Sequence, residues 1–405
     1  MAELVRRGRR VPRAPSASIL IPVLDRLDLL IPCLRSLAAL AGTPSHEVVV
    51  IANGTPESAL ATLPGQESLV VVISSLNLGF GGGCNWGARF ARGRYLVFLN
   101  DDTVVEPDWL RALVEVAEDD PRIGAVGSRL LDPDGTLQEA GSILWSDATT
   151  HPVGRGLPPG TPAYDSVRDV DYCSACGLLV RREAWEAAGG FDEAYFPAYR
   201  EDVDLCLSLR ARGYRTVYAP GARVVHHRGG SLEEGARTLL GLHSGAHFIA
   251  KWGEVLKDFD PPPRGRPSAS EVAAAIARAS RRPLPPLRPP EPGARPERPP
   301  TEVDLLQAQV RALQAAGAIA SDELRSLHRE HAQLERLRHL PGTLSISRSV
   351  SQPARWESSA ASVSWRRLAS SAAAPKPTTP ATFSVPDRRS RSWPPPVIWA
   401  AGKTA

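Results

Sequence analysis

Two adjacent carboxylates follow an apolar run in the stretch YLVFLNDDTVVEPDW, which covers residues 95–109. Asp101 and Asp102 stand where a buried strand would end, although charge repulsion and lost hydration both oppose placing them there. The structural alternative is a helix cap, because aspartate often precedes a helix that starts with proline, and Pro107 follows. Other segments of the chain decide between these two interpretations.

Further groups that can bind a cation occur later in the chain. Glu201 and Asp202 come just before a helical pattern, and His226 and His227 end an apolar run that RGGS follows. The glycine-rich stretch NLGFGGGCN at 77–85 allows the backbone to approach a ligand closely. Carboxylate oxygens and an imidazole suit Mg²⁺ or Mn²⁺, and such a cation pairs naturally with a diphosphate. We therefore expect a divalent cation site that accepts a diphosphate.

The first 260 residues alternate short apolar runs with helical patterns, which favours an α/β fold with a mainly parallel sheet. Ligands bind such sheets at the carboxyl ends of the strands. Three polar segments, ANGT at 52–55, SLNLGFGGG at 75–83 and NDDT at 100–103, follow predicted strands and should meet there. Strands are predicted at Ser18–Val23, Glu47–Ile51, Leu69–Ile73, Arg94–Leu99 and Ile123–Ser128, and helices at Asp25–Leu40, Gly82–Arg92 and Pro107–Ala117.

The residues from about 130 to 235 mix loops with shorter patterns. Strands are predicted for CGLLVR at 176–181, TVYAP at 216–220 and ARVVHH at 222–227, and a helix for Val203–Arg212. This part of the chain is expected to pack onto the sheet and to close one side of the site.

Composition limits the class of protein. A formal net charge of +4, with no dense basic face in the first 260 residues, argues against a nucleic-acid partner. Five cysteines scattered over 405 residues indicate reduced cytosolic thiols, and Cys173 and Cys176 are expected to be structural. No apolar run reaches membrane-spanning length. We expect a cytoplasmic protein whose basic arm is solvated or, alternatively, contacts the inner face of the cell membrane.

Proline clusters and helical periodicity divide the chain further. Two proline-rich stretches follow residue 260, and Ala269–Ser280 between them is predicted to form one short helix. A heptad pattern runs through 302–340, where a coiled coil that self-associates and a single amphipathic helix are equal alternatives. The predicted organisation is a disordered basic arm at 1–16, an α/β domain at 17–258, a Pro-rich linker at 259–301, a helix at 302–340 and a disordered tail at 341–405.

Five stretches in a fixed order give the sequence a family resemblance. They are SILIPVLDRLDLLIPCLRSL, VVVIANGT, NLGFGGGCNWGARFARGRYLVFLNDDT, GGFDEAYFPAYREDVDLCLSLRARGY and VVHHRGGS. Together they resemble the inverting family-2 glycosyltransferases, and within these the rhamnosyltransferase-like branch, over about residues 18–231. The resemblance implies the GT-A fold, which is α/β with a mainly parallel central sheet.

The resemblance also implies roles for the acidic residues and the histidines. Asp102 stands at the metal-binding position of the D-x-D motif, and His226 fits the H-x-x-G-x-S pattern as the second metal ligand, with His227 as the alternative. Asp202, in the pair Glu201–Asp202, corresponds to the catalytic general base. The implied cofactor is Mg²⁺ or Mn²⁺.

A donor site at the nucleotide end of the sheet is implied in the same way. Ala52 stands where the family usually has aspartate, Asp25 replaces a frequent asparagine, and Pro56–Glu57 replaces Thr–Asp. These departures concern recognition of the nucleobase of the donor and not the transfer reaction. The residues implied to bind the donor are Pro22, Asn53, Asn77, Gly79, Phe80 and Asp101.

The implied activity is an inverting transfer of a sugar from a nucleoside diphosphate to a cell-wall or polysaccharide acceptor. The favoured donor is dTDP-rhamnose, and the acceptor is a glycan or a polyprenyl-linked molecule. A UDP-hexose or UDP-galactofuranose donor is the alternative within this class. From another class, a non-catalytic scaffold would bind partners through the 302–340 helix. A nucleotide-binding oxidoreductase is disfavoured, because GFGGG does not follow a strand with the Gly-x-Gly-x-x-Gly spacing and the downstream acidic residue of the dinucleotide-binding motif.

Overall fold

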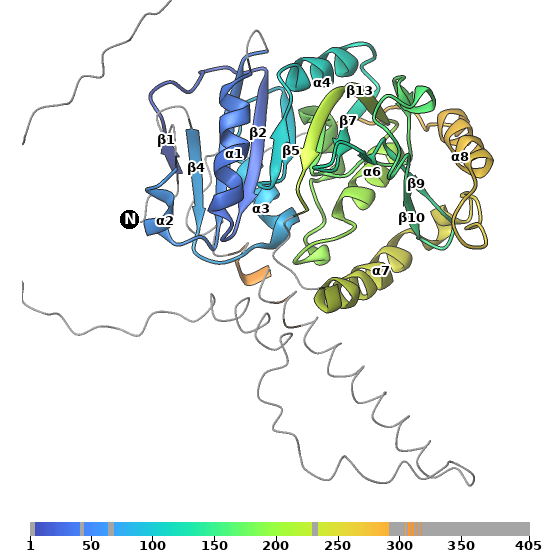
Figure 1. Ribbon diagram of the computed structural model, residues 1–405. Helices are drawn as coiled ribbons and strands as arrows, with labels where there is room; N and C mark the ends of the chain where they lie inside the picture. The colour runs from blue at the N-terminus through green and yellow to red at the C-terminus, as the bar shows by residue number, and fades with distance from the viewer. Residues whose placement is uncertain are drawn as a thin grey trace, which may run out of the picture. The chain divides into compact units, whose positions relative to one another are not determined.

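Apolar, β-branched segments build the centre of the protein in the computed structural model (Figure 1). β4 (Leu69–Ser74), β3 (His46–Asn53), β2 (Ala17–Val23) and β5 (Tyr95–Leu99) lie side by side in this order and pair in parallel. Their side chains are almost all buried, as expected for parallel strands that helices cover on both faces. The predicted α/β fold with a mainly parallel centre is confirmed.

Helices cover both faces of these strands. α1 (Leu27–Ala38) and α4 (Trp109–Glu118) pack on one face, which receives alternate residues of β2 such as Ile19. α3 (Gly79–Ala88) packs on the other face, with Leu20. Because α3 connects β4 to β5 across β3 and β2, its first turn lies at the carboxyl ends of the strands, where ligands bind.

The second half of the sheet brings late segments of the chain to the same edge. β12 (Gly177–Arg181) lies antiparallel between β5 and β7 (Ile123–Leu131). β13 (Arg215–His226) pairs in parallel with β7, and the short β6 (Thr103–Val105) pairs antiparallel with the end of β13. β13 therefore delivers its last residue beside the segment that follows β5.

A layer of short elements closes this edge. β8 (Leu137–Glu139) pairs with β7, and β9 (Ser142–Leu144) and β10 (Thr150–Pro152) form a hairpin next to it. α6 (Glu201–Ala211) lies across from the hairpin (Figure 1). The remaining elements are β1 (Val5–Arg7), α2 (Glu57–Leu60), β11 (Arg168–Asp169), α5 (Arg182–Ala188), α7 (Glu234–Leu256), α8 (Ala269–Arg281) and the 3-10 turns Pro162–Tyr164 and Glu193–Tyr195.

The structure describes residues 5–40, 44–63, 69–228 and 234–290, and seven positions between 304 and 317. The predicted tail at 341–405 and most of the predicted 302–340 helix lie outside the described residues, so both stay predictions. In the part of the chain that is described, no helix combines the length and the apolar character needed to cross a membrane.

Two segments that were predicted to lack a folded core contact the domain. Val5, in the basic arm, lies opposite Val72 in an antiparallel pairing of β1 with β4. In the Pro-rich segment, α8 buries Val272 against the β9–β10 hairpin, and Arg282 forms an ion pair with buried Asp171 at 2.6 Å. The apolar stripe of α8 and polar contacts such as the hydrogen bond from Arg122 to the Pro285 carbonyl hold residues 259–290 against the domain, which proline content alone does not reveal.

The close approach of α3 to β3 depends on a glycine. A methyl group on Gly87 would lie 2.6 Å from Cγ1 of Ile51. We expect Gly87→Ala to lower the free energy of unfolding by about 1–3 kcal/mol through overpacking, measured by urea denaturation. The matched control is Gly253→Ala in α7, where nothing lies within 4 Å, and it should raise stability by about 0.5–1 kcal/mol. Unchanged stability of Gly87→Ala would contradict this account of the packing.

Candidate active site

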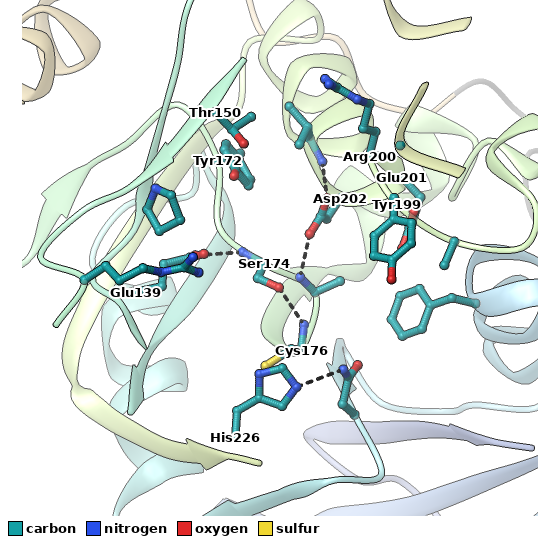
Figure 2. Close-up of a pocket in the computed structure, with 18 residues that line it drawn as sticks. Glu139, Thr150, Tyr172, Ser174, Cys176, Tyr199, Arg200, Glu201, Asp202 and His226 are labelled. Atoms are coloured by element: carbon teal, nitrogen blue, oxygen red, sulfur yellow. Dashed lines mark hydrogen bonds between the residues drawn. The ribbon is translucent and has the colours of Figure 1, made fainter. Parts of the chain in front are cut away.

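A pocket of about 570 Å³ opens between the first turn of α6, the β9–β10 hairpin and the end of β13 (Figure 2). Its lining joins segments that are far apart in the sequence. Phe80 lies in α3 and Asn100 follows β5, whereas the first turn of α6 and the end of β13 supply Glu201, Asp202 and His226. The predicted catalytic pair and the predicted metal-binding histidine thus face one cavity.

Pairing between β6 and β13 places the predicted metal ligands beside each other. His226 lies opposite Thr103 in the register, so its Nε2 is 3.2 Å from Oδ1 of buried Asp102. The backbone N–H of His227 donates to the carbonyl oxygen of Asp102 at 3.0 Å, and the His227 side chain is exposed. The geometry therefore favours His226 over His227 as the partner of Asp102.

Asp102 and His226 fit two neighbouring ligands of one divalent cation. In an octahedral Mg²⁺ site with bonds of about 2.1 Å, adjacent ligands are about 3 Å apart, close to the observed 3.2 Å. Gln138 Oε1 lies 2.7 Å from Nδ1 of His226, which assigns the proton of a neutral ring to Nδ1 and leaves the Nε2 lone pair for a cation. Within the described ranges no three His, Cys, Asp or Glu residues form a cation site, so diphosphate and water oxygens would supply the other ligands.

Charge at His226 is set by its neighbours. Burial lowers the pKa of His226, but Cys176 and Asp102 raise it more, to about 11. Burial also raises the pKa of Cys176, so its sulfur is a neutral thiol and the carboxylate of Asp102 is the charge that holds a proton on the ring. A bound cation would compete with that proton, because a metal-bound imidazole is neutral.

Asp202 lies in the first turn of α6 and faces the pocket. The backbone N–H of Val203 donates to its Oδ1 at 2.8 Å, and that of Ala175 donates to its Oδ2 at 3.3 Å. Tyr199 and Arg200 precede the helix with φ of 84° and 73°, a left-handed conformation that non-glycine residues rarely adopt. Burial raises the pKa of Asp202. The site thus holds a fixed carboxyl group that is more basic than an ordinary aspartate.

The two acidic neighbours of Asp202 have different surroundings. Glu201 is buried, its Oε2 has no hydrogen-bond partner among the described residues, and burial together with Asp202 raises its pKa well above the usual range. Asp204 instead accepts hydrogen bonds from Lys251 at 2.9 Å and from Trp252 Nε1 at 2.6 Å, which tie α6 to α7. Glu201 therefore lines the pocket, whereas Asp204 stabilises the packing of α6 against α7.

The predicted donor residues cluster at the ends of the parallel strands. Asn53 is buried, and its Nδ2 donates to Asn77 Oδ1 at 3.1 Å and to the Gly79 carbonyl at 2.9 Å, while its Oδ1 accepts from Leu78 N at 2.7 Å. These bonds fix the turn that begins α3 and present Phe80 to the pocket. A direct contact of these residues with a donor stays a prediction.

Asp101 and Pro22 do not line the pocket drawn in Figure 2. Burial and the charge of Asp102 raise the pKa of Asp101 to about 7. Pro22 is partly exposed near the carboxyl end of β2. The donor roles of both residues also stay predictions.

Sequence reasoning missed three contributors to the site, which are Gln138, Glu139 and the segment 174–176. The Ser174 N–H donates to Glu139 Oε1 at 2.9 Å, the next N–H binds Asp202, and the Cys176 thiol lies beside His226 (Figure 2). The CSAC motif drew attention to its thiols, which are buried and free as expected. No local pattern marks the backbone amides between them, or the three-residue strand β8 that carries Glu139.

Comparison with known proteins assigns a family to this site. The Glycosyl transferase family 2 profile matches residues 18–184. An N-acetylglucosaminyl-diphospho-decaprenol L-rhamnosyltransferase from Mycobacterium tuberculosis is 32% identical over 243 residues, which cover 53% of this chain and 78% of that protein. The chain belongs to glycosyltransferase family 2.

Other family-2 relatives differ in length. The O-antigen biosynthesis protein RfbC of Myxococcus xanthus is 39% identical over 228 residues, 54% of this chain but only 18% of that protein. The chain therefore spans a minor part of some relatives. Among solved structures, a mannosyltransferase from Pyrobaculum calidifontis in complex with GDP-Man and Mn²⁺ is 16% identical, with a TM-score of 0.44 and coverage of 81% of this chain and 83% of that chain.

The buried carboxyl group of Glu139 predicts an unusual pH dependence of stability. Burial is the main cause that raises the pKa of Glu139 from 4.5 to about 7. The folded state therefore favours the protonated form, and this contribution to stability is lost as the pH rises through about 7. Since one pH unit corresponds to about 1.4 kcal/mol, Glu139→Gln should be more stable than the wild type by up to about 3 kcal/mol at about pH 8 and nearly equal at about pH 4.

Thermal unfolding at both pH values measures this difference. Glu47→Gln is the matched control, because buried Glu47 pairs with Arg92 at 2.8 Å and its replacement should destabilise the fold at the higher pH. A Glu139→Gln protein that gains no stability between the two pH values would contradict the buried, protonated state of Glu139.

Proposed function

We propose that the chain is an inverting glycosyltransferase that moves a sugar from a nucleoside diphosphate to a hydroxyl group of an acceptor. The observation that carries this proposal is that Asp102, His226 and Asp202 converge on one edge of the sheet. Asp102 and His226, called here the cation pair because they would bind one cation, lie 3.2 Å apart, and the fixed carboxyl group of Asp202 lies across the pocket. A cation pair suits a diphosphate leaving group, and a separate carboxylate suits a proton acceptor.

The chemistry needs one base and a stabilised leaving group. Asp202 accepts the proton of the acceptor hydroxyl while the hydroxyl oxygen forms a bond to the anomeric carbon. The bond between that carbon and the diphosphate breaks, and its electron pair leaves with the diphosphate. Attack from the face opposite the diphosphate inverts the anomeric carbon. A divalent cation held by Asp102 and His226 would neutralise the negative charge that develops on the diphosphate.

The position of Asp202 supports its role as the base. Its two backbone hydrogen bonds stop the carboxyl group from rotating, and its raised pKa makes it a better proton acceptor than an exposed aspartate. Phe80 and the turn that Asn53 holds at the start of α3 would bind the donor nearby. Asp101, next to the cation pair, would contact the ribose or the sugar.

The favoured donor is dTDP-rhamnose, because two similar proteins, from Mycobacterium tuberculosis and from Escherichia coli, are rhamnosyltransferases by name. The protein from Escherichia coli is 28% identical over 146 residues, which cover 34% of this chain and 54% of that protein. The acceptor of the mycobacterial relative is linked through a diphosphate to a polyprenol by its name. A polyprenyl-linked glycan acceptor would bring this protein to the cytoplasmic face of the membrane. Nucleotide release from a panel of dTDP-rhamnose, UDP-hexoses and UDP-galactofuranose tests the donor.

Replacing the base should separate chemistry from binding. We expect Asp202→Asn to lower the rate of sugar transfer by at least about 100-fold, while calorimetry records an unchanged affinity for the donor. Asp204→Asn is the matched control on the same helix, because Asp204 binds Lys251 and Trp252 outside the pocket and should lose stability but keep transfer. Near-native turnover of Asp202→Asn would show that another group is the base.

Two variants test the cation pair. Asp102→Asn should weaken donor binding only when Mn²⁺ is present, because it removes a charged ligand. Gln138→Leu leaves both ligands in place but removes the acceptor for His226 Nδ1–H, and should weaken Mn²⁺ binding about tenfold. Calorimetric titration of dTDP with and without Mn²⁺ measures both effects, and the exposed Asp108→Asn variant is the control. Mn²⁺-dependent binding that survives Asp102→Asn would contradict this assignment.

A further inference from the structure

Glu139 is a buried carboxyl group in the pocket that the transfer chemistry does not use. It lines the cavity together with Asp202, and its residue is only 6% exposed. Within the described residues Glu139 forms no ion pair, although Arg155 lies close enough to lower its pKa. Burying a carboxyl group that has backbone hydrogen bonding but no ion pair costs stability when the group ionises, and this one lines the cavity, which favours a role in binding a ligand.

Glu139 and Asp202 are both bound by one peptide segment, residues 174–175. Consecutive backbone amides, Ser174 N and Ala175 N, donate to the two carboxyl groups at 2.9 Å and 3.3 Å (Figure 2). The two amides belong to adjacent residues, whose Cα atoms are about 3.8 Å apart, and their two acceptors line the same cavity. The charge of Asp202 contributes to the raised pKa of Glu139, as expected for groups this close.

The wall that carries Glu139 lies away from the nucleotide end of the sheet. β8 and the β9–β10 hairpin supply Glu139, Thr150 and Pro152 to the pocket, and Arg155 and Tyr172 complete this side. The donor residues instead approach from α3 and from the end of β5. A molecule between this wall and Asp202 would therefore be the acceptor and not the donor.

We propose that Glu139 binds the acceptor sugar by accepting a hydrogen bond from the hydroxyl group next to the one that Asp202 deprotonates. This assignment rests on the proposed transferase function. The two carboxyl groups together recognise a pair of neighbouring hydroxyls, and Glu139 decides which of them faces the base. Glu139 thus determines the linkage that the enzyme forms, and the acceptor is a sugar with two adjacent free hydroxyl groups at the reacting end.

The 405-residue chain is assayed with dTDP-rhamnose and a panel of octyl glycosides that carry different hydroxyl patterns. For the best acceptor of the panel, Glu139→Ala should raise the KM for the acceptor about tenfold, because the hydrogen bond that the Glu139 carboxyl group accepts is lost, and Glu139→Gln, whose amide oxygen can still accept, should raise it less. Glu47→Gln, a buried glutamate at the amino end of β3, is the matched control for a general loss of stability.

Acceptor analogues make the test independent of folding. Removing the hydroxyl next to the linked one should cost the wild type about as much as Glu139→Ala, and should cost Glu139→Ala nothing further, because both changes remove the same hydrogen bond. NMR of the product should also reveal new linkages from Glu139→Ala.

The outcomes separate the two levels of the proposal. Additive effects of the deoxy acceptor and Glu139→Ala, or an unchanged KM and a single linkage, would overturn the role of Glu139 while leaving the transferase intact. A second result would also overturn acceptor binding. If Glu139→Ala lowered kcat without changing KM, and Glu139→Gln kept both constants normal, the role of Glu139 would be to position Ser174 through its hydrogen bond. A wild-type protein that transfers to no glycoside and releases no nucleotide from any donor would overturn the proposed function itself.

Discussion

The register of β13 against β6 is the constraint on which the rest of the site depends. Side chains alternate between the two sides of a strand, so a shift of one residue would move His226 away from Asp102 and bring His227 in. The register is held from the other side by the long parallel pairing of β13 with β7, in which Val224 and Val225 face Leu130 and Leu131. Ordinary burial of apolar strand residues therefore decides which imidazole can share a cation with the carboxylate.

A second constraint comes from the three residues 174–176, which connect the parts of the pocket. Each contacts one functional group, because two consecutive amides bind Glu139 and Asp202 and the next side chain lies beside His226. These groups come from β8, α6 and β13, which are separate in sequence. The segment leads directly into β12, the strand that joins the two halves of the sheet. Positions across the pocket are thus tied to the centre of the fold.

The parallel half of the fold could be predicted because each strand is a continuous apolar run with polar residues after it. The helix predicted at Gly82–Arg92 begins earlier, at Gly79, since Asn53 on another strand binds the turn before it. The sequence predicts two strands where the structure has β13, because Pro220 interrupts the pattern. In the structure one strand continues through Pro220, with a register shift against β7 between Ala219 and Arg223. The motif residues of the site lie in long recognisable stretches. Glu139 lies on a three-residue strand with no periodicity, and only tertiary structure brings it to the pocket.

The surroundings of Glu201 and Asp202 explain why the second of these neighbours is the suitable base. Two adjacent buried carboxyl groups do not both ionise readily, because their charges repel in a medium of low polarity. Asp202 receives two backbone N–H donors and is only partly buried, whereas Glu201 has a buried oxygen with no partner among the described residues. The proton therefore stays on Glu201, whose pKa lies well above its usual range, and the negative charge resides on Asp202. Unequal hydrogen bonding of two neighbours thus selects one proton acceptor, and the left-handed backbone before them turns that acceptor toward the pocket.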